Sequence, residues 1–391
     1  RDEVRKSAAE SVSLLKSAGV HTVMITGDSK ETASSVAKEC GILSKENDIV
    51  LTGEEFASKT DLWVKEHLVN IAVVSRAMPN DKNRLVRLGK EANHVVGMTG
   101  DGINDAPALK SADVGFAMGS GTDVAKEAGD IIIIDNDLKS IVKAVLYGRT
   151  VFKSIRKFIT FQLIMNLCAV GVTFFGHLLG IDQPITVIQM LWINMIMDTL
   201  GGLAFAGEYP MKNYLKERPL GREEPILEGK MLRRVAVMGA YGTALCSAFL
   251  AGGTVRRMMQ FEESPIPMLT CLFALFIFTG IAICFTARSD RINILSGLSK
   301  NKAFTVIMLS ITAIQLLMLF FGGKTLRCEG MTPKRLAFVT VCALSVFPVD
   351  FVRRLVERAF TRNKKGRKNR KIRRLPEKAS AEHRKNRLLR N

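Results

Sequence analysis

Six long apolar stretches in the second part of the chain constrain its fold more than any other feature. They lie at about Phe158–Leu179, Pro184–Ala206, Val235–Val255, Pro267–Thr286, Ala303–Phe321 and Leu336–Val352. Each is close to the roughly 20 residues that a helix needs to cross the hydrocarbon core of a bilayer. A single stretch of this kind is also compatible with a buried helix of a water-soluble protein. Six in succession predict an all-α membrane domain with six transmembrane helices over residues 151–355.

Basic residues gather in particular segments between and after these stretches. Glu208–Arg234, Arg288–Lys302 and the tail 356–391 are rich in Lys and Arg, although the loops near Arg256 and Lys324 also carry positive charge. Loops rich in Lys and Arg usually stay on the cytosolic side of a membrane. We therefore expect a multi-pass integral membrane protein whose first part and C-terminal tail are cytosolic.

Residues 1–150 alternate between short apolar runs and amphipathic segments such as Lys30–Cys40 and Asp81–Glu91. The β-forming runs are His21–Thr26, Ile71–Arg76, His94–Thr99, Val114–Met118 and Asp130–Asp135. Continuously apolar strands between amphipathic helices predict an α/β domain whose parallel sheet is covered by helices on both faces. Ligand sites in such sheets lie at the carboxyl ends of the strands. Polar motifs follow two of the predicted strands directly.

The strongest chemical signal is the run MTGDGINDAPALKSAD, which spans Met98–Asp113. Asp101 ends a predicted strand, a glycine turn follows, and a second carboxylate, Asp105, comes four residues later. Carboxylate and phosphate oxygens are the ligands that Mg²⁺ prefers. A structural turn needs only TGDG, so the longer run with Asn104 and Asp105 predicts a magnesium site beside a phosphate.

Two shorter motifs add candidate catalytic residues. The run MITGDSKETA places Thr26, Gly27 and Asp28 just before a predicted helix, whose N-terminus favours anions. Alone, this run is equally typical of an ordinary helix N-cap. The run RAMPNDK carries Arg76 and Lys82, and a lysine at the start of a helix can neutralise phosphoryl oxygens. A lone lysine is more often a solvated surface charge. This motif therefore supports a phosphate site only in combination with the other two.

Together the three motifs resemble the haloacid-dehalogenase-like phosphorylation domain of P-type ATPases, and the resemblance extends almost to the C-terminal tail. In that family the threonine of TGD binds the phosphate, which maps to Thr26. A lysine that contacts the aspartyl phosphate maps to Lys82, and an arginine that helps to hold ATP maps to Arg76. The first aspartate of TGDGIND binds Mg²⁺ in the family and maps to Asp101. Asn104 and Asp105 would support the site.

One element of the family pattern is absent from the sequence. The DKTGT signature, whose aspartate becomes phosphorylated, occurs nowhere in the chain. The nucleotide-binding insertion, the actuator domain with its TGE motif and the first four membrane helices are missing as well. The resemblance therefore implies the C-terminal part of an ATP-driven pump, which needs its missing N-terminal part and is inactive alone.

The second apolar stretch contains Asp198, the only acidic residue deep within a predicted span, in the run QMLWINMIMDTL. An ionisable residue in a membrane helix is costly and by default suggests an ion pathway. Asn194 lies four residues earlier on the same helical face, and amide and carboxylate oxygens are the hard ligands that calcium takes. An interhelical hydrogen bond is the alternative. Gly201 and Gly202 follow, where the helix can loosen and free carbonyl groups for an ion.

The first stretch contains Asn166, which alone is equally compatible with an interhelical hydrogen bond. Its surroundings resemble the fifth span of calcium pumps, and the run LWINMIMDT resembles their sixth. Sarcoplasmic-reticulum-type pumps, which carry two calcium ions, have glutamates at the positions of Ala169 and Cys284. Plasma-membrane-type pumps have alanine at the first position and match this chain at Met197. The resemblance therefore implies a single site for the transported Ca²⁺, formed by Asn194 and Asp198 together with Asn166.

Other functions remain open at this point. Secretory-pathway pumps share a similar NxxMD run and also move manganese, so a manganese or monovalent-cation pump is one alternative. Heavy-metal pumps are disfavoured because no pair of cysteines is placed to bind a soft ion. A non-catalytic regulatory or assembly fragment is the alternative from a different class.

The net charge of +19 belongs largely to the tail, because Thr361–Asn391 contains fourteen Lys or Arg and two Glu. Such a segment is typically solvated, and its place after a membrane helix favours anionic lipid headgroups as its partner. No aromatic interleaving or binding motif accompanies the basic residues, so we expect no nucleic-acid partner. The seven cysteines show no zinc-site spacing.

Overall fold

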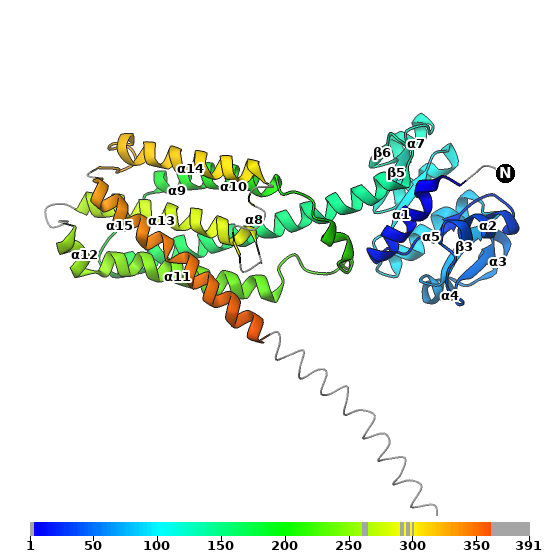
Figure 1. The fold of residues 1–391 in the computed structure, drawn as a ribbon, viewed down its shortest axis with the longest axis horizontal. Coiled ribbons are helices and arrows are strands. Elements are labelled where there is room, and N and C mark those ends of the chain that lie inside the picture. Colours follow the sequence, from blue (N-terminus) through cyan, green and yellow to red (C-terminus); the bar gives the residue numbers. More distant parts are fainter. Residues whose placement is uncertain are drawn as a thin grey trace, which may run out of the picture. The chain divides into compact units, whose positions relative to one another are not determined.

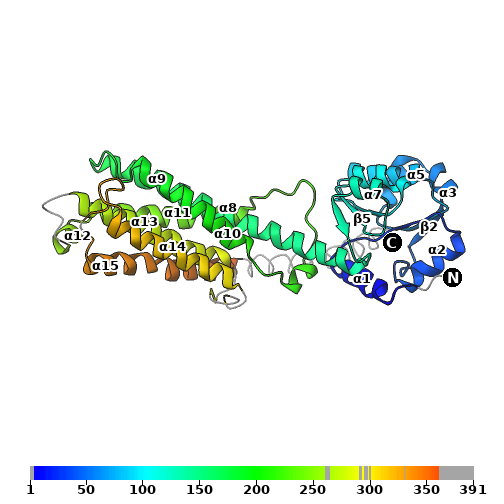
Figure 2. The same ribbon diagram turned by 90° about the horizontal axis from the view of Figure 1, so that it is seen from above.

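The computed structural model describes residues 4–259, 265–289, 293–294, 298, 301–329 and 331–360. The chain divides into two compact units (Figures 1 and 2). An α/β unit consists of Arg1–Lys153 with the loop Tyr209–Ile226, and a helical unit consists of Ser154–Glu208 with the chain from Leu227 onward. The loop thus belongs to the α/β unit although it lies between two membrane stretches in sequence. The basic tail predicted over 356–391 lies almost entirely outside the described residues.

Six described strands form two three-stranded sheets in which all pairs are parallel. In the first sheet the order is β1 (Met24–Ile25), β3 (Ile71–Ser75) and β2 (Ile49–Thr52), and in the second it is β4 (Gly97–Gly100), β5 (Val114–Met118) and β6 (Ile131–Ile133). The central strand β3 reads IAVVS, and all five of its residues are buried. The sequence predicts five of these strands and misses β2, which is short and partly exposed.

Helices cover both faces of the sheets, which confirms the predicted α/β arrangement. Their bounds are α1 Lys6–Ser17, α2 Lys30–Glu39, α3 Gly53–Ser58, α4 Asp61–His67, α5 Pro79–Glu91, η1 Ile103–Asp105, α6 Ala106–Ser111 and α7 Asp123–Ala128. Side chains of β3 pack in one core with α1 and α2 and in another with α3, α4 and α5. The second sheet packs against α5, α6 and α7 in one core and against the start of α8 (Leu138–Leu178) in another.

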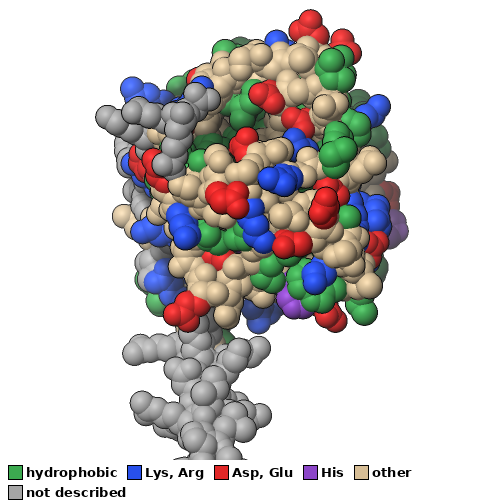
Figure 3. Space-filling view, turned by 90° about the vertical axis from the view of Figure 1, so that its right-hand side faces the viewer, with side chains coloured by type: hydrophobic (Ala, Val, Ile, Leu, Met, Phe, Trp, Pro, Cys, Tyr) green, Lys and Arg blue, Asp and Glu red, His purple; other side chains and the backbone are tan. Residues whose placement is uncertain are grey.

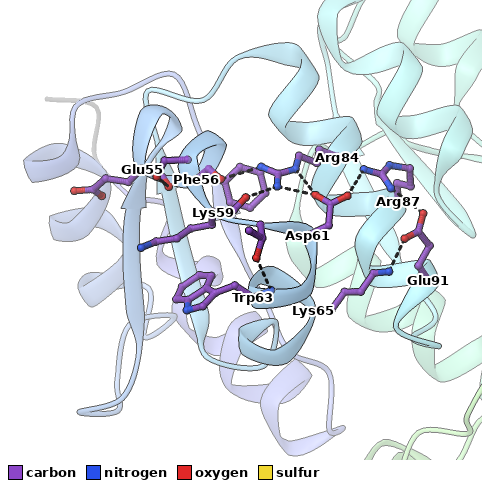
Figure 4. Close-up of polar contacts among 11 residues, drawn as sticks. Glu55, Phe56, Lys59, Asp61, Trp63, Lys65, Arg84, Arg87 and Glu91 are labelled. Atoms are coloured by element: carbon purple, nitrogen blue, oxygen red, sulfur yellow. Dashed lines mark hydrogen bonds and ion pairs between the residues drawn. The ribbon is translucent and has the colours of Figure 1, made fainter.

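Helix α5 is fixed to its neighbours by a network of charged side chains (Figure 4). Arg84 donates to the Asp61 carboxylate from Nε at 3.0 Å and Nη2 at 2.7 Å, and also to the carbonyls of Phe56 and Lys59. Arg87 donates to the other oxygen of Asp61 at 3.0 Å. These hydrogen bonds, Arg84 first and then Arg87, hold the pKa of Asp61 below its usual value. The network thereby fixes the helix whose first turn carries the candidate residue Lys82.

Acidic and basic side chains are intermixed on the face of the α/β unit that Figure 3 shows. Within the same unit, Arg149 links the loop Tyr209–Ile226 to the end of α1. The guanidinium of Arg149 donates to the carbonyl of Ala18 at 2.6 Å and to three carbonyls of the loop, those of Tyr214, Leu215 and Glu217. Farther along the loop, Arg222 forms an ion pair with Asp113.

The helical unit confirms the six predicted membrane stretches. The described residues contain six helical segments long and apolar enough to cross a membrane: Leu138–Leu178, Val187–Ala206, Gly229–Ala251, Pro265–Arg288, Lys302–Phe321 and Pro333–Phe360. In this order they correspond to α8, to α9 (Val187–Ile193) with α10 (Thr199–Ala206), to α11, α13 and α14, and to the segment that begins with α15 (Pro333–Leu344). Helix α12 (Gly253–Met258) is too short to be one of them. Helix α13 is buried along most of its length among the others. Helix α8 runs without a break for 41 residues.

A buried charge cluster joins three membrane helices near the end of the last one. Asp350 is fully buried and accepts from Arg354 Nε at 2.5 Å and from Arg353 Nη2 at 2.7 Å. Arg354 also donates to the carbonyl of Thr286 in α13, which accepts from Arg234 of α11 as well. The expectation that Asp198 is the only deeply placed acidic residue of the spans is therefore wrong. Asp350 is the more buried of the two because basic partners from its own helix neutralise it.

We expect Asp350→Ala to destabilise the helical unit by about 3–5 kcal/mol, because Arg354 would stay buried without its counter-charge. The measurement is the thermal unfolding midpoint of the purified chain in detergent. Glu329→Ala removes an exposed acidic side chain from the same unit and should leave the midpoint unchanged. Equal midpoints for the two variants would show that the cluster contributes no net stability.

Candidate functional site

The TGD motif lies at the carboxyl end of β1, as the sequence predicts. The hydroxyl of Thr26 donates to Asp28 Oδ2 at 2.9 Å and accepts from the backbone N–H of Asp28 at 3.2 Å. Gly27 and Asp28 are exposed, and Ser29 then caps α2 by accepting from the N–H of Thr32. The motif therefore stands just before the N-cap of α2 and presents a hydroxyl and backbone N–H groups beside a helix N-terminus, where an anion is favoured.

Arg76 lies beside this motif in a conformation that is uncommon for a residue with a side chain. Its φ is +47°, in the left-handed region, immediately after the buried strand β3. The N–H of Arg76 donates to the carbonyl of Asp28 at 2.8 Å, and the N–H of Ala77 donates to the carbonyl of Thr26 at 2.9 Å. Backbone strain of this kind concentrates at functional sites. The two hydrogen bonds fasten the ends of β1 and β3 together.

Lys82 and Asp105 meet, although they come from different motifs. The Nζ of Lys82 lies 2.6 Å from Asp105 Oδ1, and the two side chains are 21% and 8% exposed. The other oxygen of Asp105 accepts weakly from the N–H groups of Asp101 and Gly102, at 3.3 and 3.4 Å. A Cβ on Gly100 would come within 2.5 Å of the Asp105 side chain, so glycine is required there. Asp105 thus shapes the loop and orients Lys82.

Asp101 is the carboxylate that remains available for a metal. It is exposed at the end of β4, and its backbone carbonyl is held by the N–H of Thr122 at 2.8 Å. Asp105 is engaged by Lys82 and is therefore not a free ligand. Magnesium is commonly held by one or two carboxylates together with substrate phosphate oxygens and water. The residues present fit Mg²⁺ on that pattern, with Asp101 as the protein ligand.

The structure joins the predicted phosphoryl-transfer residues in two groups. Thr26, Asp28 and Arg76 form one group through the hydrogen bonds above, and Lys82 with Asp105 forms the other. Within the described part of the chain, no hydrogen bond or ion pair links the first group to Asp101 or to Asn104, which is exposed. Lys82 lies in the first turn of α5, which follows β3 of the first sheet, whereas Asp105 follows β4 of the second, so their ion pair joins the carboxyl ends of the two sheets.

The three predicted cation ligands line one small cavity in the helical unit. Asn166 comes from α8, and Asn194 and Asp198 come from the second membrane segment. Apolar side chains such as Met197 and Phe276 complete the walls. Asn166 and Asn194 are exposed at the surface of the described helices, whereas Asp198 is half-buried. The cavity thus gathers three oxygen-bearing side chains within apolar surroundings.

The second membrane segment is irregular at the predicted ligands themselves. Asn194–Asp198 form a π-helical turn, η2, between α9 and α10. The expectation that the helix loosens at Gly201 and Gly202 is wrong, because both lie within regular helix α10. Positions where their Cβ atoms would stand are 3.7 Å from the ring of Phe161 and 3.6 Å from that of Phe158. A Cβ would make only ordinary van der Waals contact at either glycine, whereas the π-helical turn is of the kind often found at functional sites.

Sequence reasoning missed one residue at this site, Gln162 of α8. Its Nε2 donates to Asp198 Oδ2 at 2.6 Å. The signal that could have revealed it is its place one helical turn before Asn166, on the same face of α8.

Models of known families match both units of the chain. Residues 182–356 match the family of cation-transporting ATPase C-terminal domains. Residues 1–113 match one family of haloacid dehalogenase-like hydrolases, and residues 83–145 match a second. The two hydrolase families thus match the α/β part of the chain, and the ATPase family matches the helical part.

Curated relatives are similar to the chain over most of its length. A plasma-membrane-type calcium-transporting ATPase 8 of Arabidopsis thaliana is 38% identical over 335 residues, which are 83% of this chain and 31% of the relative. A plasma-membrane-type calcium-transporting ATPase 5 of Oryza sativa is 36% identical over 91% of this chain and 34% of the relative. The plasma membrane calcium-transporting ATPase 3 of Homo sapiens is 36% identical over 85% of this chain and 29% of the relative.

The chain spans about a third of the length of these relatives. Both of its units match their expected counterparts, and the relatives cover nearly all of the sequence. The chain therefore belongs to the family of P-type cation-transporting ATPases.

Proposed function

We propose that the chain is the C-terminal third of an ATP-driven calcium pump that works through an aspartyl-phosphate intermediate. The observation that carries the proposal is the convergence of Asn166, Asn194 and Asp198 on one cavity in the helical unit. Hard oxygen ligands favour calcium over soft metal ions. The relatives described above are calcium-transporting ATPases, which supports the same cargo.

The nucleophile would lie on a strand outside this chain. Strands β1 and β4 each have one neighbour among the described strands, so each leaves an edge open. Both are followed by a phosphate- or metal-binding motif. One further parallel strand between them would join the two sheets, and its carboxyl end would lie beside Thr26, Lys82 and Asp101. An aspartate at that end would be placed to attack ATP, which supports the interpretation that the DKTGT segment belongs to the missing part.

The residues of this chain would then serve that aspartate. The hydroxyl of Thr26 orients the transferred phosphoryl group, and the Nζ of Lys82, held by Asp105, neutralises its oxygens. Arg76 helps to hold ATP. Mg²⁺ held by Asp101 would neutralise phosphoryl charge further. Asn104 supports the loop in which Asp101 lies.

The cation site would be completed by the missing part as well. Calcium takes six to eight oxygen ligands, and the three side chains supply too few. The exposed amides of Asn166 and Asn194 would be costly against lipid, which supports a further helix packing on this side. Helix α8 begins in the α/β unit and carries Asn166, so it offers a continuous connection through which phosphorylation could be coupled to the ion.

We further propose that the chain divides into domains at residues 1–150, 151–355 and 356–391. The segments rich in Lys and Arg support a cytosolic location for the first domain and for the tail. Manganese or a monovalent cation is the alternative cargo. Without its nucleophile the chain by itself would be a non-catalytic fragment.

We expect the purified chain to form no acid-stable phosphoenzyme with radioactive ATP, because it lacks the nucleophile. Adding a separately expressed N-terminal part that carries DKTGT should restore calcium-dependent labelling. The control is the same N-terminal part with the DKTGT aspartate changed to asparagine, which should stay unlabelled. Labelling of the chain alone would show that its nucleophile lies within residues 1–391.

A further inference from the structure

Gln162 makes the contact that holds the Asp198 carboxylate. Among the described residues it is the one side chain that hydrogen-bonds to that carboxylate, through Nε2 at 2.6 Å. No basic side chain of the described spans pairs with Asp198. A carboxylate in apolar surroundings needs a donor or a counter-charge to stay ionised. The amide of Gln162 supplies such a donor.

The other end of the same amide lacks a partner. Oε1 of Gln162 is buried and has no hydrogen bond within the described part of the chain. Buried side-chain oxygens nearly always accept a hydrogen bond, so an orphan of this kind calls for an explanation. A half-turn about the last side-chain bond would exchange Oε1 and Nε2 without changing the shape of the side chain. The oxygen would then lie beside Asp198, where a cation would favour it over an N–H group.

We propose that Gln162 is a further residue of the transported-cation site: Nε2 holds Asp198 while the site is empty, and Oε1 becomes a ligand when the cation arrives. This inference rests on the function proposed above and extends it by one residue. Gln162 precedes Asn166 by one turn of α8, so both amides face the same side. A side chain that donates in one state and accepts in the other can serve the empty and the loaded site alike.

A second buried glutamine offers a matched control. Gln315 of α14 is 3% exposed, and its Nε2 has no partner within the described residues. It does not line the cavity that contains Asp198. Replacing Gln315 therefore tests what the loss of a buried amide from a membrane helix does to folding, separately from the cation site.

The test uses the complete pump and measures how phosphorylation from ATP depends on calcium. Gln162→Leu should raise the calcium concentration for half-maximal phosphorylation about tenfold or more, in the range of supporting residues at metal sites. Gln162→Glu keeps oxygen ligands and should stay within about threefold of the wild type, since ligand charge sets calcium affinity. Gln315→Leu should match the wild type. Phosphorylation by inorganic phosphate should persist in all three variants, which shows that they fold.

Three results would overturn the inference. The first is a wild-type calcium dependence in Gln162→Leu. The second is an equal loss in Gln162→Leu and Gln162→Glu, which would mean that Gln162 only clamps Asp198 through its N–H group. The third is a wild-type pump with no dependence on calcium, and only that result would also overturn the proposed function.

Discussion

Asp198→Asn should abolish the calcium-activated phosphorylation of the complete pump by ATP. The change removes the negative charge of the cavity shared with Asn166 and Asn194, while leaving the size of the side chain almost unchanged. Loss of one partner from a desolvated charge pair is worth about 3–5 kcal/mol, which corresponds to a loss of affinity of roughly two to three and a half orders of magnitude. The measurement is phosphoenzyme formation over a range of calcium concentrations, with manganese and sodium tested in parallel.

Phosphorylation of the same variant by inorganic phosphate should survive, because that reaction uses Thr26, Lys82 and Asp101. Asp182→Asn is the matched control, since Asp182 is an exposed acidic residue in the connection between α8 and α9. It should keep the wild-type calcium dependence. If Asp198→Asn also keeps it, the cation site lies elsewhere and the assignment of the cargo loses its main support. A response to manganese alone would identify manganese as the cargo.

Asp101→Asn should reduce phosphorylation of the complete pump about 10²-fold or more at ordinary magnesium concentrations. The carboxylate of Asp101 is the exposed one at the end of β4, whereas Asp105 is held by Lys82. Removing the charge of Asp101 weakens the binding of Mg²⁺ at a site where electrostatic stabilisation dominates catalysis. The measurement is the rate of phosphoenzyme formation as a function of magnesium, and raised magnesium should recover part of the rate.

The control for this variant is Asp123→Asn in the first turn of α7. The Asp123 side chain is 95% exposed and belongs to the same unit, so its loss should not change the rate. Calcium binding should be unaffected by either substitution. Normal turnover of Asp101→Asn at low magnesium would show that Asp101 is not the metal ligand.

Several local features of the protein could be predicted from the sequence. The six membrane helices follow from the lengths of the apolar runs, because hydropathy over about 20 residues is a local property. Helices α2 and α5 begin and end close to the predicted bounds, Lys30–Cys40 and Asp81–Glu91, because their amphipathic pattern and flanking turns are also local. Strand β2 escaped prediction because it reads IVLT, a short continuous apolar run that periodicity alone cannot distinguish from a helical segment.

The sequence by itself determined the kinds of residue at each site, and only the tertiary structure decided which of them meet. Residue types at strand ends and within apolar runs can be read directly from the amino-acid sequence, so Asp101 and Asp198 could be identified as candidate ligands. The contact between Lys82 and Asp105 joins residues 23 apart, and that between Gln162 and Asp198 joins residues 36 apart. Such pairs depend on how helices pack against one another, and many partners are compatible with the same pattern. The burial of Asp350 was decided in the same way, by Arg354 together with carbonyl groups of another helix.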